Sequence, residues 1–95
     1  MRTITFESVD AFNNSINFKK SNMKIEVINN DAYMYLHNNL IAKRINNVLS
    51  ITNAGWQSNT TKERLNSLDG VSIYQKNFIW YLNGKEWDGN WIEIK

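Results

Sequence analysis

Alternating apolar and polar residues, interrupted by pairs of asparagine, occupy the chain from Met23 to Thr52. Alternation gives a β-strand one apolar face, and Asn tolerates the positive φ that short hairpin turns require. The alternating segments are 23–28, 32–37, 40–45 and 48–52, each separated from the next by an Asn pair. We therefore predict a four-stranded antiparallel meander in which each strand pairs with the next.

A first helix is expected ahead of the meander, over residues 7–18. Val9, Phe12 and Ile16 recur there at helical spacing. Two Asn residues in the middle of this segment weaken its helix propensity, so packing against the sheet must hold the helix.

A second helix is expected after the meander, over residues 58–70. Thr60 and Glu63 form a capping-box pattern, in which the Thr side chain bonds forward and the Glu side chain reaches back. Gly55 lies just ahead of this helix and is expected to adopt a positive φ. Trp56 is expected to be partly buried, sealing the helix start against the sheet.

Three further strands are predicted in the C-terminal part, at 71–75, 78–83 and 91–94. The whole is an α+β fold: a small antiparallel sheet, made of the meander plus C-terminal hairpin strands, covered by two short helices. We expect one domain over residues 1–95, with an N-terminal helical segment at 1–22 and a core at 23–95.

The composition argues against catalysis. The chain has no Cys and a single His, His37, and it contains neither a phosphate-binding glycine loop nor the residue spacing of a metal site. We therefore expect no enzyme activity, no cofactor and no metal. No apolar run approaches the roughly 20 residues of a membrane span, and residues 1–10 lack the apolar core of a signal peptide. A cytoplasmic protein without membrane association is expected.

The segment from Thr52 to Asn66, "TNAGWQSNTTKERLN", contains the ingredients of a phosphate site. A helix start offers free N–H groups, hydroxyls cluster around it, and two cations follow. The alternative is that these hydroxyls cap the helix and that Lys62 and Arg64 lie on a solvated face. The residues expected to contact nucleic acid are Lys43, Arg44, Trp56, Ser58, Thr60, Thr61, Lys62, Arg64 and Lys76.

Aromatic residues are more numerous in the last 25 positions than one buried face can hold. Phe78 and Trp80 alternate with Ile79 and Tyr81, so both faces of one strand are apolar. Some rings must therefore remain exposed. Exposed rings beside Lys and Arg suit base stacking, and they suit a protein-interface hot spot equally well.

Several pieces of the C-terminal half resemble small accessory proteins of tailed bacteriophages. The pieces are "IAKR", "NAGWQSNTTKERLN", "SIYQKNFIWYL" and "WDG", and they extend from about Leu40 to Trp91. Residues 1–22 have no counterpart in this resemblance. The resemblance implies an accessory protein that works in the cytoplasm of the infected host, and it implies no catalytic residue.

The leading hypothesis is a non-enzymatic phage protein that binds nucleic acid, RNA in preference to duplex DNA, and interferes with a host factor. By analogy, that factor could be a defence system such as a toxin–antitoxin RNase. The net charge of +2 is modest, which favours a rival: a protein–protein inhibitor of a host enzyme that acts without nucleic acid. A third possibility is a small homodimeric interaction module that pairs through an open sheet edge.

Overall fold

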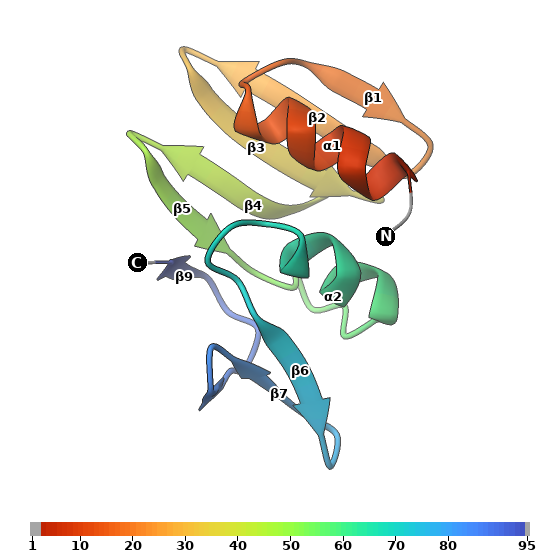
Figure 1. The fold of residues 1–95 in the computed structure, drawn as a ribbon, viewed down its shortest axis with the longest axis vertical. Coiled ribbons are helices and arrows are strands. Elements are labelled where there is room, and N and C mark those ends of the chain that lie inside the picture. The colour runs from red at the N-terminus through yellow and green to blue at the C-terminus, as the bar shows by residue number, and fades with distance from the viewer. Residues whose placement is uncertain (1–2, 95) are drawn as a thin grey trace.

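The computed structural model describes residues 3–94, which form two helices and nine strands (Figure 1). The helices are α1 (Thr3–Asn13) and α2 (Asn59–Asn66). The strands are β1 (Phe18–Lys20), β2 (Met23–Ile28), β3 (Asp31–Leu36), β4 (Asn39–Ile45), β5 (Val48–Ile51), β6 (Ile73–Lys76), β7 (Ile79–Leu82), β8 (Lys85–Glu86) and β9 (Ile92–Ile94). The predicted α+β class is confirmed.

The predicted meander is strands β2 to β5, which pair antiparallel in chain order. The Asn pairs adopt the positive φ that was expected of them: 52° and 70° at Asn29 and Asn30, 53° and 66° at Asn46 and Asn47. The middle turn consists of His37 and Asn38, one residue earlier than the predicted Asn38–Asn39 pair, and Asn39 begins β4. The sequence did not indicate β1, which pairs antiparallel with β2 and extends the sheet by one strand.

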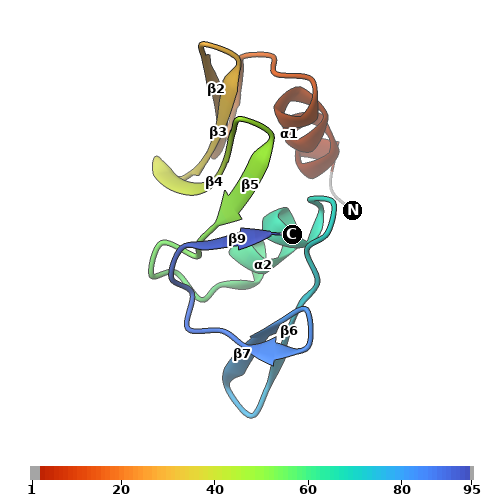
Figure 2. The same ribbon diagram turned by 90° about the vertical axis from the view of Figure 1, so that its left-hand side faces the viewer.

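Helix α1 covers one face of this sheet (Figure 2). The core lies there and continues to α2 and the β6–β7 hairpin, which add Leu65, Ile73, Trp80 and Leu82. Between β3 and β4 the register shifts: Met34 faces Ala42, but Tyr35 faces Leu40. Ile41 is thus an extra residue on β4, and the resulting bulge lets Ile41 and Ala42 both point inward, at 1% and 0% exposed. Helix α1 ends earlier than predicted, at Asn13, and Ile16 is exposed outside it.

The N-cap of helix α2 lies two residues before the predicted cap, and the helix ends at Asn66, earlier than predicted. Ser58 has an extended backbone (φ −104°, ψ 158°), and its Oγ accepts a hydrogen bond from the Thr61 N–H at 3.1 Å. Ser58 is therefore the N-cap, and Thr60 lies within the first turn. The predicted capping box is wrong, because the Glu63 carboxylate instead accepts a bond from Thr5 Oγ1 of α1 at 3.0 Å.

The cap makes a direct prediction for stability. Ser58→Ala leaves the Thr61 N–H without its acceptor and is expected to cost about 1 kcal/mol of unfolding free energy. Thr60→Ala, at a position that caps nothing, is the matched control and is expected to change stability by less than about 0.5 kcal/mol. Urea denaturation of both variants measures the difference. Equal losses at the two positions would contradict the assignment of the cap.

The C-terminal strands divide between two sheets. Strands β6, β7 and β8 form a separate three-stranded sheet next to α2, while β9 returns to pair with β5 at the edge of the six-stranded sheet, whose order is β1-β2-β3-β4-β5-β9. Gly89 positions this return, since its carbonyl accepts bonds from Asn53 N–H at 3.0 Å and Thr52 Oγ1 at 2.5 Å. The β6–β7 hairpin projects from the end of the molecule opposite β1 to β3 (Figure 1).

Candidate nucleic-acid interface

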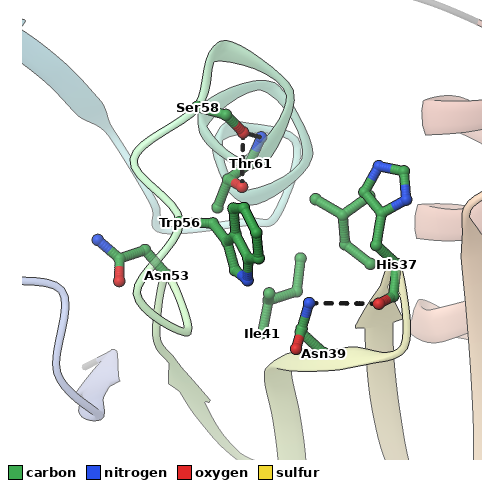
Figure 3. A pocket seen from close by; sticks show the side chains of 8 residues that line it. His37, Asn39, Ile41, Asn53, Trp56, Ser58 and Thr61 are labelled. Atoms are coloured by element: carbon green, nitrogen blue, oxygen red, sulfur yellow. Dashed lines mark hydrogen bonds between the residues drawn. The ribbon is translucent and has the colours of Figure 1, made fainter.

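A small pocket lies beside the start of α2, where the sequence predicted a phosphate site. It has a volume of about 90 Å³. Figure 3 shows it between the first turn of α2 and the β3–β4 turn, with the Trp56 indole near Ile41 and with His37 across from it. The lining residues are Leu36, His37, Asn39, Ile41, Asn53, Trp56, Ser58 and Thr61. Trp56 is 60% exposed, so the expectation that it seals the helix start is wrong.

The hydroxyls at the helix start already have partners within the chain. Ser58 Oγ and Thr61 Oγ1 lie 3.0 Å apart, and the same Ser58 oxygen caps the Thr61 N–H. Thr61 is 1% exposed, while Thr60 is only partly buried. The capping alternative thus accounts for Ser58 and Thr61. Gly55 has the expected positive φ of 83°, and its N–H donates to Asn53 Oδ1 at 2.8 Å.

Arg64 lies on the buried side of α2, so its expected exposure to phosphate is wrong. It is 1% exposed, and its guanidinium donates to Thr5 Oγ1 of α1 at 2.5 Å and also pairs with Glu63. The helical period explains the placement: Thr61, Arg64 and Leu65 are the buried residues of α2 and share one face. That spacing is visible in the sequence and indicates that Arg64 shares a face with Leu65.

The other predicted cations point in different directions. Lys62 Nζ bonds Gln75 Oε1 of β6 at 3.1 Å and lies 5.7 Å from the Trp80 ring centroid. Arg44 turns toward α1, with its guanidinium 4.9 Å from the Phe12 ring centroid, and its Nη2 donates to Ser15 Oγ, just after the helix, at 2.8 Å. Lys43 is its neighbour in β4 and therefore points to the opposite face. Lys76 is exposed at the end of β6. The predicted cations therefore do not gather on one surface.

A different surface combines rings and cations: the face of the six-stranded sheet that turns away from α1. Figure 2 shows α1 on one side of β2 to β5 and no helix on the other. We call this side the open face. By the strand register, its residues are Lys19, Lys24, Glu26, Ile28, Asp31, Tyr33, Tyr35, Leu40, Lys43, Ile45, Val48, Ser50 and Glu93, and Trp91 lies beside Lys43.

Cations and rings are paired on the open face. Lys43 Nζ lies 4.5 Å from the Trp91 ring centroid, and Lys24 Nζ lies 5.2 Å from that of Tyr35. Tyr33 faces Lys43 across the β3–β4 ladder. Trp91 is 44% exposed. Side chains two apart on a strand share a face and stand about 7 Å apart, so Tyr33 and Tyr35 present two rings in a row beside Trp91.

A family model described as the Kyanoviridae Gp96 protein matches residues 1–93. The chain belongs to this phage family. The phage affiliation expected from the resemblance is thereby confirmed, and the matched range includes residues 1–22, which lay outside that resemblance. No curated protein and no solved structure matches the chain.

Sequence reasoning selected Lys43 but missed Tyr33, Tyr35, Trp91 and Lys24 as candidate site residues. The signal was the alternation itself, because β3 buries Ala32, Met34 and Leu36 and must turn its two tyrosines to the other face. The protein-inhibitor hypothesis expected Trp80 and Trp87 to be exposed, and this expectation is wrong. Trp80 and Trp87 are 1% and 6% exposed and pack together with centroids 6.1 Å apart.

The remaining polar chemistry of the described residues is sparse. His37 is exposed in the β3–β4 turn, with its Nε2 3.5 Å from Asn22 Nδ2. Within residues 3–94, no group of three His, Asp or Glu side chains is placed to hold a metal ion. Neither of the helices described in the structure has the length and apolar character to cross a membrane.

Proposed function

We propose that this phage protein is a non-catalytic accessory protein that binds single-stranded nucleic acid, RNA in preference, on its open face. The observation that carries the proposal is the contact of Lys43 with the Trp91 ring beside Tyr33. It places a cation and stackable rings on one uncovered sheet surface. Antiparallel sheets with helices on one face and aromatic residues on the other are a recurrent platform for single-stranded RNA.

The interaction free energies favour stacking of a base on the Trp91 ring over the contact of the ring with Lys43. An exposed cation–π contact contributes about 0.5–1 kcal/mol, whereas stacking of one base on an aromatic side chain contributes about 1–3 kcal/mol. A base can therefore displace the Lys43 ammonium, which is then free to reach the adjacent phosphate. A duplex keeps its base faces stacked inside, so this surface suits a single strand.

Because the charges on the open face are balanced, base stacking must contribute most of the binding free energy. Lys19, Lys24 and Lys43 are balanced by Glu26, Asp31 and Glu93, and Lys24 already pairs with Glu26 at 3.1 Å. Two phosphate contacts on a single strand give a slope of log K against log salt of about −1.4. Affinity should thus depend weakly on salt and strongly on the rings.

Removal of Trp91 tests the proposal. With a fluorescein-labelled 12-nucleotide single-stranded RNA at low salt, Trp91→Ala is expected to weaken binding by about 5- to 150-fold, the equivalent of one lost stacking contact. Trp56→Ala, which removes an exposed Trp on another surface, is the matched control and should bind like wild type. Fluorescence anisotropy measures both.

Two outcomes would contradict the open-face site. Absence of RNA binding even at low salt, where attraction is strongest, removes nucleic acid as the ligand. Loss of binding in Trp56→Ala but not in Trp91→Ala would place the binding site at the pocket beside the start of α2. Circular dichroism of each variant confirms that it is folded before binding is compared.

The biological role that fits this binding is interference with a host factor in the cytoplasm of the infected cell. Membership of a phage family supports the setting, and a host RNase such as a toxin–antitoxin enzyme is a factor whose RNA this protein could sequester. The homodimer alternative has less support. Edge strand β1 has three residues, two of them Lys, and short, lysine-bearing edges resist pairing with a second chain.

A further inference from the structure

The tip of the β6–β7 hairpin holds a phenylalanine in a conformation and environment that do not suit it. Phe78 has a φ of 66° and is 90% exposed. A bulky side chain with positive φ is a steric outlier, and the left-handed conformation lowers the folding equilibrium constant by roughly 5- to 30-fold. The exposed ring makes little contact with the fold that could offset this.

The same chain shows which residues suit this position. The second residue of the two-residue turns after β2, β3, β4 and β7 is Asn30, Asn38, Asn47 or Gly84, with φ between 65° and 88°. These are the residue types that such turns favour. At this position the chain has a strained, exposed Phe78 in place of the Asn or Gly that the turn favours. This points to a contact of the ring with another molecule.

The hairpin holds this ring on a rigid support. On one side, Ile73, Trp80 and Leu82 are buried, and Lys62 of α2 bonds Gln75. The other side carries Tyr74 and Tyr81, stacked with centroids 5.0 Å apart and planes at 11°. Lys76 and Ile79 pair on that same side. We call Tyr74, Lys76, Phe78, Ile79 and Tyr81 the hairpin patch.

We propose that the hairpin patch docks into a concave apolar pocket of a partner protein, with Phe78 as the inserted anchor and an acidic side chain at the pocket rim facing Lys76. The hairpin projects from the molecule (Figure 1), so the complementary surface must be concave. Exposed Phe78, Tyr74 and Ile79 match the composition of interface hot spots.

A protein fits this patch better than a nucleic acid does. Lys76 is its one cation, and Glu86 lies directly across from Tyr81, so the patch has no row of positive charges to follow a backbone. The two tyrosines stack on each other, which occupies one face of each ring. The patch is also separate from the open face, so this inference does not depend on RNA binding.

Photo-crosslinking identifies the partner. We expect p-benzoyl-L-phenylalanine at position 78 of the full chain, expressed in infected host cells, to crosslink to one host or phage protein. The same probe at position 47, the equivalent place in the β4–β5 turn, is the matched control and should not crosslink to it. Crosslinks from position 78 to nucleic acid or to a second copy, or no more crosslinking than from position 47, would overturn the proposal.

The affinity of this protein for the purified partner that crosslinking identifies decides whether the contact is specific. Phe78→Asn should weaken binding by about 30-fold or more, as expected for a hot spot, and Lys76→Glu should weaken it through repulsion at the acidic rim. Asn47→Ser should leave binding unchanged. Unchanged affinity in Phe78→Asn would overturn the proposal.

Thermal unfolding provides a partner-independent measurement on the same variant. Because Asn tolerates the turn conformation, Phe78→Asn should raise Tm by about 4–8 °C. A lower Tm would show that the ring stabilises the fold, which would overturn the argument that it is held for a partner.

Discussion

Arg64→Ala is expected to destabilise the folded chain by about 2–5 kcal/mol, since it leaves a cavity where a large buried side chain packs and removes the hydrogen-bond donor of the buried Thr5 hydroxyl. The Arg64 guanidinium is 1% exposed and joins α2 to α1 through Thr5 Oγ1 at 2.5 Å. Its loss leaves a cavity between the helices and removes the cation beside Glu63. A chain of this size has about 5–14 kcal/mol of stability, so the variant should be close to unfolding at physiological temperature.

The neighbouring cation is the matched control for this prediction. Lys62 is only partly buried, bonding Gln75 and lying near the Trp80 ring. Lys62→Ala should therefore cost less than about 1 kcal/mol. Urea denaturation of both variants gives the two free energies. Equal, small losses would contradict the buried position of Arg64 and would place it back on the solvated face.

Gly89→Ala is expected to cost about 3–5 kcal/mol, the combined result of backbone strain, overpacking and a displaced hydrogen-bonded side chain. Gly89 has a φ of 89°, and an added Cβ would collide with the side chain of Asn53. Asn53 is 3% exposed and its Oδ1 accepts the Gly55 N–H, so it has no free space to enter. The substitution therefore disturbs the segment that leads into β9, where this strand pairs with β5 of the six-stranded sheet.

Gly84 separates the two contributions to this cost. It has nearly the same φ, 88°, but an added Cβ would meet no atom within 4 Å. Gly84→Ala should therefore show backbone strain alone, about 1–2 kcal/mol. Thermal or urea unfolding of the pair gives the steric contribution by difference. Equal losses in both variants would show that Asn53 moves aside without cost.

The meander was predictable because its signals are local. Alternation determines which side chains share a face, and each Asn pair supplies at least one residue of a two-residue turn. The same logic located α2 and anticipated the positive φ at Gly55. The cap was misplaced because Ser58 and Thr60 are both acceptable caps, and only the path of the chain entering the helix selects Ser58.

The candidate site was harder to predict because it depends on which face each element buries. Helical spacing indicates that Arg64 shares a face with Leu65, but a charged residue is rarely buried without a partner. That partner is Thr5, 59 positions away, and no local pattern brings the two together. Trp91 reaches Lys43 only because β9 pairs with β5.

The sequence by itself therefore determined the α+β class, the four central strands and their turns, since these follow from the spacing of residues along a few positions of the chain. Only the tertiary structure decided that the C-terminal strands divide between two sheets, that Arg64 is buried while Trp56 and Phe78 are exposed, and that the rings and lysines of the open face share one surface. These outcomes depend on contacts between residues distant in the chain, where packing and the need to pair buried polar groups override local preference.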